Sequence, residues 1–217
     1  MVDLHPAAPG PSAADPASAA GVVETPVRVA HIIGADGRVR RSLRVFCWRN
    51  AASVALARCA ECDHRVAITE ASDRSGLVLI CRMVDGPDPP GLPPELVGPS
   101  MSREVICAEP DARLAQVHAA LPVNLDVIAV IHDDGRLLGV VNGERHLHDP
   151  IALRTPVREL MAGAPITVEE TTSLEAAVRV MAVERKRRLP VVNGGQLVVG
   201  VLQDVEAMHR LFQRRPG

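Results

Sequence analysis

The sequence predicts an α+β fold in which an internal duplication fills the C-terminal half and a small β module with four cysteines precedes it. Three observations support this prediction. A pattern of strand, helix and hairpin occurs twice between residues 100 and 217. Aromatic residues make up 1% of the chain, so its cores must be built from aliphatic side chains. A proline-rich segment separates the two parts, and prolines deny backbone donors to any regular element there.

The duplication appears as segments that match at a nearly constant offset. Residues 101–109 match residues 161–169 at an offset of 60, and residues 139–141 match residues 200–202 at an offset of 61. One inserted residue accounts for the difference. Asp-Gly in the first copy and Asn-Gly in the second separate apolar runs, which is typical of hairpin turns that need positive φ.

Each copy predicts the same elements in the same order. Asp111 in the first copy and Thr172 or Ser173 in the second are the expected N-caps of the helices. We expect short strands at 105–108 and 166–168, helices that begin near 114 and 174, hairpin strands at 127–131 with 137–141 and at 189–192 with 197–202, and a last helix at 204–214.

Composition divides the chain further. We expect a disordered tail rich in Ala and Pro at 1–25, the cysteine module at 26–84, a linker at 85–99, and the two copies at 100–152 and 153–217. No apolar run approaches the roughly 20 residues that cross a bilayer, and no signal peptide is visible. The sequence therefore predicts a cytoplasmic protein with no membrane partner.

The repeated pattern resembles the tandem CBS domain, a pair of cystathionine-beta-synthase-type units. In the second copy residues 157–161 resemble the entry segment, 188–192 the inner strand and 200–202 the outer strand, whereas the first copy has Ala129 where a Pro is expected. The resemblance covers about residues 98–212. It implies a pseudo-twofold pair that forms a homodimer and acts as a non-enzymatic regulator or sensor.

The resemblance also implies an adenosine-containing ligand, such as AMP, ATP or S-adenosylmethionine, in a cleft between the copies. The family's phosphate and ribose positions fall on Gln203 and Glu206 in the second copy. In the first copy they fall on Asn142 and Arg145, and an arginine cannot accept a hydrogen bond from ribose. The expected ligand-binding residues are Thr167, Arg188, Leu189, Pro190, Gln203, Glu206, Cys107, Ile128, Asn142 and Arg145.

The cysteine module carries Cys47, Cys59, Cys62 and Cys81 with the spacing C-x11-C-x2-C-x18-C. A hairpin formed by residues 65–69 and the run that ends at Cys81 would bring Cys81 beside the Cys59–Cys62 pair. Four thiolates with no open position suit structural zinc, which would add folding energy to a small core. We therefore expect a zinc-ribbon-like module with zinc as its cofactor; the alternative is a set of reduced thiols.

Two other functions stay open at this point. Between residues 26 and 85 the chain has ten Arg against six Asp and Glu, and five of these arginines form a cluster: Arg38, Arg40, Arg41, Arg44 and Arg49. The cluster could contact phosphates in a nucleic-acid-binding regulator, but the preferred interpretation is a solvated arginine-rich face. The third alternative is an interaction scaffold whose clefts bind no ligand. The sequence carries no phosphate loop, nucleophile elbow or HExxH motif, so it predicts no enzyme.

Overall fold

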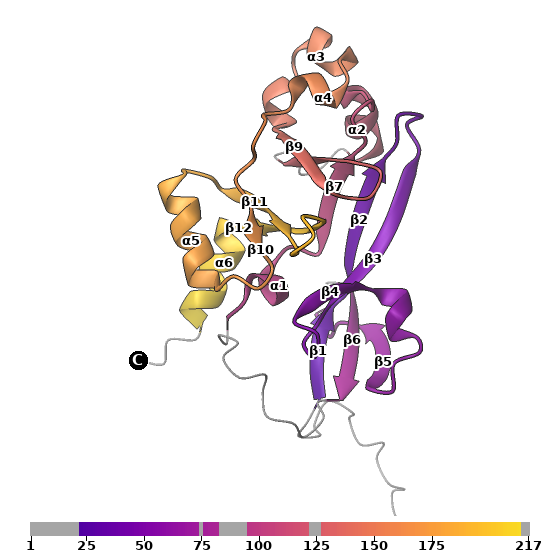
Figure 1. Cartoon of the computed structure of the whole chain (residues 1–217), viewed down its shortest axis with the longest axis vertical. Coiled ribbons are helices and arrows are strands. Elements are labelled where there is room, and N and C mark those ends of the chain that lie inside the picture. Colours follow the sequence, from indigo (N-terminus) through magenta and orange to yellow (C-terminus); the bar gives the residue numbers. More distant parts are fainter. Residues whose placement is uncertain (1–21, 74–75, 83–94, 122–126, 214–217) are drawn as a thin grey trace, which may run out of the picture.

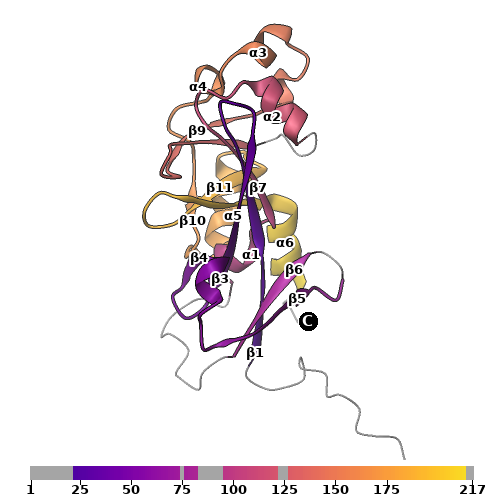
Figure 2. The same cartoon turned by 90° about the vertical axis from the view of Figure 1, so that its right-hand side faces the viewer.

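A computed structural model describes residues 22–73, 76–82, 95–121 and 127–213 (Figure 1, Figure 2). The strands are β1 (Val22–Pro26), β2 (Arg28–Ile33), β3 (Val39–Cys47), β4 (Ala52–Ala55), β5 (Arg65–Glu70), β6 (Leu77–Arg82), β7 (Glu104–Ala108), β8 (Ile128–Ile131), β9 (Leu137–Val141), β10 (Val168–Glu169), β11 (Arg188–Val192) and β12 (Val198–Gln203). The helices are α1 (Val97–Ser100), α2 (Leu114–Ala120), α3 (Pro150–Arg154), α4 (Val157–Leu160), α5 (Leu174–Val183) and α6 (Asp204–Gln213), with the short 3-10 helices η2 (Leu56–Cys59) and η3 (Glu144–His146).

Three sheets organise these strands in the α+β fold that the sequence predicts. The largest has the order β4-β3-β2-β7-β8-β9, and two three-stranded sheets have the orders β1-β6-β5 and β10-β11-β12. In Figure 1 the β2–β3 hairpin runs from the small β1-β6-β5 sheet along the first repeat. Within the described ranges, no helix has the length and apolar character needed to cross a bilayer.

The predicted duplication is confirmed in the strand topology. In the first repeat β7 pairs parallel with β8, which pairs antiparallel with β9; in the second, β10, β11 and β12 repeat this arrangement. Both hairpins have one residue at positive φ in the same place, Gly135 at +88° and Gln196 at +60°. The second turn therefore uses Gln196 where the Asn-Gly pair suggested a glycine.

The helix N-caps match the prediction in one repeat only. Ser173 Oγ accepts a hydrogen bond from the Ala176 amide at 3.2 Å, as expected for the second copy. Asp111 was the wrong cap for the first copy, because α2 begins later and Arg113 occupies the cap position. Asp111 instead forms an ion pair with Arg158 of α4.

Each repeat completes its core with the segment that precedes the other repeat. Val97 of α1 and the following Met101 pack with Leu174 in the core of the second repeat. Val157 of α4 and the following Met161 pack in the core of the first. Residues 157–161 thus stand at the start of the second copy in sequence but supply side chains to the first.

Two glycines on the outer strands make this exchange sterically feasible. A Cβ on Gly200 would lie 2.3 Å from Met101 Sδ, and a Cβ on Gly139 would lie 2.6 Å from Met161 Sδ. Real Cβ atoms do not approach other atoms this closely. The two contacts are equivalent under the 60- to 61-residue offset, so the pseudo-twofold relation extends to side-chain packing.

Backbone hydrogen bonds follow the same reciprocal pattern. The Ser102 amide donates to the Val201 carbonyl at 2.8 Å, and the Ala162 amide donates to the Val140 carbonyl at 3.0 Å. The first bond holds Ser102, which follows Met101, beside β12. The second holds Ala162, which follows Met161, beside β9. Ser102 is therefore held next to the end of β12.

The N-terminal part is joined to both repeats. Strand β2 pairs parallel with β7, so the predicted module and the first repeat share one sheet. Glu109 accepts a hydrogen bond from the Ala35 amide at 3.0 Å, and Glu170 accepts one from the Ser53 amide at 2.8 Å. Each repeat thus anchors the N-terminal part through a glutamate that follows its first strand, one position later in the second repeat than in the first.

The predicted boundaries stay predictions with two corrections, one of which is that helix α1 (Val97–Ser100) begins inside the linker expected at 85–99. Strand β1 begins at Val22, whereas the disordered tail was expected to reach residue 25. Residues 1–21 and residues 83–94, which include most of the linker predicted at 85–99, lie outside the described residues. The predicted hairpin before Cys81 is confirmed, because β5 and β6 pair antiparallel.

Phe46 at the end of β3 packs against the backbone of α1. It is 1% exposed, and its ring meets the Trp48 ring edge-on at a centroid distance of 5.3 Å. A Cβ on Gly98 would lie 2.4 Å from two Phe46 ring carbons and 3.1 Å from the Glu170 carbonyl oxygen. The absence of a side chain at Gly98 therefore sets how closely the N-terminal part approaches the second repeat.

We expect Gly98→Ala to lower the free energy of unfolding by about 1–3 kcal/mol, the usual effect of overpacking a buried contact. Chemical denaturation followed by the fluorescence of the single tryptophan, Trp48, measures it. Gly194→Ala is the matched control, because nothing lies within 4 Å of a Cβ there. Equal stability of the two variants would contradict the close approach of Phe46.

Glu170 is 2% exposed, and this burial raises the pKa of its carboxyl group. The hydrogen bond from the Ser53 amide and the charges of Arg44 and Arg28 offset part of the effect. A raised pKa in the folded state means that the carboxyl contributes stability below its unfolded pKa of about 4.3. That contribution is lost as the pH rises through the folded value.

Glu170→Gln keeps an acceptor for the Ser53 amide and removes the titration. We therefore expect the melting temperature of the variant, relative to wild type, to be higher at pH 7.5 than at pH 4. Thermal denaturation across this range measures the difference, with Glu175→Gln on the exposed face of α5 as control. A relative melting temperature that falls with rising pH would show that attraction to the arginines outweighs burial.

Candidate functional site

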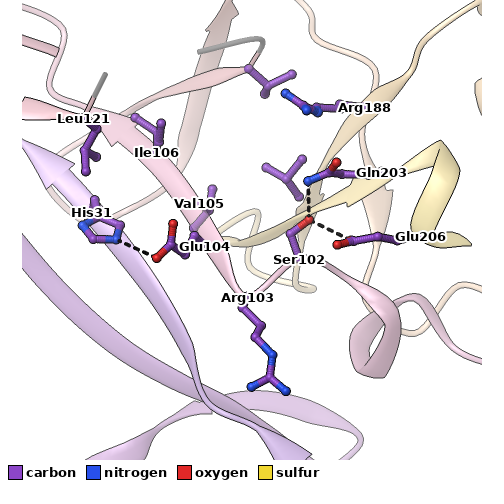
Figure 3. A pocket seen from close by; sticks show the side chains of 12 residues that line it. His31, Ser102, Arg103, Glu104, Val105, Ile106, Leu121, Arg188, Gln203 and Glu206 are labelled. Carbon is purple, nitrogen blue, oxygen red and sulfur yellow. Dashed lines mark hydrogen bonds and ion pairs between the residues drawn. The ribbon is translucent and has the colours of Figure 1, made fainter. Parts of the chain in front are cut away.

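A cleft of about 210 Å³ lies where the two repeats and the N-terminal part meet (Figure 3). Its walls come from β2, from the segment that leads into β7, and from β11, β12 and the start of α6. The reciprocal packing places the β7 entry beside the end of β12. The cleft therefore exists only when both repeats are docked.

One end of the cleft is polar and internally hydrogen-bonded. Ser102 Oγ accepts a hydrogen bond from Gln203 Nε2 at 2.9 Å and lies 2.9 Å from Glu206 Oε2, to which it donates. Glu206 lies in the first turn of α6, where the helix dipole favours negative charge. A carboxylate has about four acceptor positions, so the bond from Ser102 leaves Glu206 able to accept from a ligand hydroxyl.

The other end of the cleft is lined by aliphatic side chains. Val105, Ile106, Leu121 and Val127 line it together with the His31 ring. In Figure 3 His31, Ile106 and Leu121 lie on the side opposite Gln203 and Glu206. A flat apolar group fits such a wall, and a polyhydroxyl group fits the opposite end.

His31 of β2 is the polar group of the apolar end. It is 7% exposed, and neither ring nitrogen has a hydrogen-bond partner within the described residues. Its Nε2 lies 3.9 Å from Glu104 Oε1, which is longer than a hydrogen bond, and the Glu104 side chain is 66% exposed. The imidazole therefore borders the cleft with hydrogen-bonding capacity that no described residue uses, and both of its nitrogens are covered by neighbouring atoms.

Two arginines supply positive charge to the cleft. Arg188 begins β11, where it lies opposite Gln203 in the antiparallel pair. Arg103 lines the cleft with its stem, and its Nη1 donates to the Leu77 carbonyl at 3.1 Å. Figure 3 shows the Arg103 guanidinium directed away from the polar cluster, so Arg188 is the better placed of the two for an anionic group.

The structure brings some of the expected ligand-binding residues together. Arg188, Gln203 and Glu206 line this cleft, and their predicted role in binding stays a prediction. Asn142 and Arg145 do not line the cleft. They lie at the start of η3, where Asn142 Oδ1 accepts a hydrogen bond from the Arg145 amide at 3.1 Å.

The other expected residues do not line this cleft, and all of them except Thr167 lie in strands. Leu189, Ile128 and Cys107 are fully buried, and burial raises the pKa of the Cys107 thiol to about 12. Cys107 is thus a protonated packing residue. Pro190 is also buried, and Thr167 is partly exposed just before β10.

Sequence reasoning missed His31, Ser102 and Glu104 as cleft residues. Ser102 directly follows the repeated Met101, so its position before a strand was a usable signal. His31 had no such signal, because it reaches the cleft only through the pairing of β2 with β7. That pairing joins segments more than 70 residues apart.

The four cysteines of the N-terminal part lie near one another. Cys59 and Cys81 pack in the same apolar cluster with Val27 and Leu79. Burial, together with the neighbouring charges of Cys59, Cys62 and Cys47, raises the pKa of Cys81 to about 11. Yet among the described residues no group of three or more His, Cys, Asp or Glu side chains has an arrangement that could hold a metal ion. The expected zinc-ribbon-like site is therefore not supported by this geometry.

Comparison with known proteins places the second repeat in a family. Residues 157–211 match the model of the CBS domain. Inosine-5'-monophosphate dehydrogenase from Mycobacterium tuberculosis and that from Mycobacterium bovis are each 31% identical over 104 residues, which are 47% of this chain and 20% of the relative. The chain thus spans about a fifth of the length of these curated relatives.

Two solved structures share the fold at a TM-score of 0.50. The cytosolic domain of the Mg²⁺ channel MgtE in complex with ATP is 23% identical, with 55% of this chain and 50% of that chain covered. The soluble part of a magnesium transporter is 13% identical, with 58% and 50% covered. Residues 157–211 therefore match a CBS domain, and the α+β structure around them shares its fold with the soluble parts of these magnesium-transport proteins.

Proposed function

We propose that this chain is a non-catalytic regulatory protein that binds an adenosine-containing ligand in the cleft between its repeats. The observation that carries the proposal is the arrangement of Ser102, Gln203 and Glu206 at one end of that cleft. A carboxylate held in this way can accept charge-assisted hydrogen bonds from the two hydroxyls of a ribose.

The rest of the cleft suits the other parts of such a ligand. The aliphatic wall opposite Glu206 fits a purine base. Arg188 lies where a phosphate or another anionic group attached to the ribose would extend. The cleft volume of about 210 Å³ is below the roughly 300–1,000 Å³ of pockets for drug-sized ligands. It therefore fits a nucleoside, with a phosphate tail extending outwards.

The comparisons support this class of ligand. The MgtE structure of the same fold was determined with ATP, and the CBS-domain match covers the repeat that supplies Arg188, Gln203 and Glu206. Because the chain spans only a fifth of the dehydrogenase relatives, their activity is not transferred to it. Ligand binding in this cleft would change the orientation of the N-terminal part or of a partner protein.

Thermal denaturation with AMP, ATP and S-adenosylmethionine tests the proposal. A ligand at 100 times its Kd adds about 2.7 kcal/mol to the free energy of unfolding, which corresponds to a rise in Tm of roughly 5–10 °C. We expect Glu206→Ala to lower this rise and to weaken binding in calorimetry by at least about tenfold. Glu175→Ala, whose exposed carboxylate pairs with Arg179, is the control. The absence of a shift with any of the three would favour the ligand-free scaffold.

Three further expectations stay predictions. A homodimer through the CBS pair is tested by sedimentation. Zinc at Cys47, Cys59, Cys62 and Cys81 is tested by metal analysis of the purified protein. Nucleic-acid binding has less support, because Arg40 pairs with Glu109 and Arg38 with Asp36, so part of the arginine cluster is neutralised within the chain.

A further inference from the structure

We infer that His31, a residue of the N-terminal part, is a specificity-determining residue of the cleft that hydrogen-bonds the edge of the bound base. This inference rests on the proposed function, because it assigns one more contact to the same ligand. It adds that recognition is shared between the CBS pair and a segment outside it.

The burial of His31 without partners is the first argument. The side chain is more than nine-tenths buried, and neither Nδ1 nor Nε2 has a hydrogen-bond partner in the part of the chain that the structure describes. Buried polar groups in folded proteins are nearly always hydrogen-bonded, so an unpaired imidazole lowers stability. A ligand group in the cleft would satisfy it.

The neighbours of His31 are the second argument. The ring lines the apolar end of the cleft beside Ile106 and Leu121, opposite the Ser102, Gln203 and Glu206 cluster (Figure 3). When a ribose binds at Glu206, the base must extend toward this apolar end. A neutral imidazole offers one donor and one acceptor, which matches the alternating donors and acceptors on a purine edge.

The position of Glu104 is the third argument. Its carboxylate is 3.9 Å from His31 Nε2 and its side chain is largely exposed, so it does not bind His31 firmly. It can accept from an exocyclic amine on the same edge of the base. The strand pairing holds both residues in place, because β2 lies in register beside β7 with His31 opposite Ile106.

The test combines His31→Phe with adenosine analogues that each lack one group of the base edge: purine riboside, 1-deazaadenosine and 7-deazaadenosine. Calorimetry measures each Kd. We expect adenosine to bind His31→Phe about 5- to 10-fold more weakly than wild type, the usual loss for one hydrogen bond. For wild type, at least one analogue should have a higher Kd than adenosine. For His31→Phe, the same analogue should have the same Kd as adenosine.

Further variants separate recognition from structure. His31→Gln restores a donor and an acceptor and should recover part of the lost affinity. His148→Phe, on an exposed residue away from the cleft, should leave every Kd unchanged. We expect His31→Phe to unfold at the wild-type temperature or above, because it removes unpaired polar atoms from a buried position.

Three outcomes would overturn the inference. One is that His31→Phe binds adenosine as tightly as wild type does. Another is that every base analogue loses the same affinity, relative to adenosine, in wild type and in His31→Phe. The third is that His31→Phe loses affinity for AMP but not for adenosine, which would place His31 at a phosphate. If wild type bound none of the nucleosides or nucleotides, the proposed function itself would fail, which is a distinct result.

Discussion

The reciprocal packing of two methionines on two glycines is the constraint on which the rest of the structure depends. Met101 packs on Gly200 and Met161 on Gly139, so closely that neither glycine position has room for a side chain. This packing docks each entry segment on the opposite repeat, so the two aliphatic cores form together. The cleft follows directly, because Ser102 comes next after Met101 and Gln203 lies at the end of the strand that carries Gly200.

Sequence patterns predicted most of the second half because its signals are local. The offset of 60 to 61 residues, the apolar periods and the turn residues are all properties of short segments, and the observed strands and helices lie close to the expected ranges. The errors have physical causes. Asp111 lies before the cap position of α2, which Arg113 occupies, and it forms an ion pair with Arg158 of α4 instead. That contact comes from the exchange of entry segments, which no local pattern reveals.

The candidate site shows the same division. Arg188, Gln203 and Glu206, which line the cleft, were predicted because they occupy family positions in the better-matching copy. His31 was not predicted, because it lines the cleft only through the addition of β2 to the sheet of the first repeat. The cysteines illustrate the opposite case. Their spacing gave a strong local signal for zinc, whereas the described geometry brings the thiols into one neighbourhood without forming a metal-binding arrangement.

The N-terminal part is built into the pair at several points: β2 in the sheet, Glu109 and Glu170 on backbone amides, and Phe46 on Gly98. A ligand that touches both β2 and β12 would therefore tighten the attachment between them. Hydrogen exchange with and without saturating ATP tests this most directly. We predict slower exchange in residues 28–33, 101–106 and 201–206 together, with residues 139–145 unchanged. Protection confined to residues 139–145, or none at saturation, would contradict it.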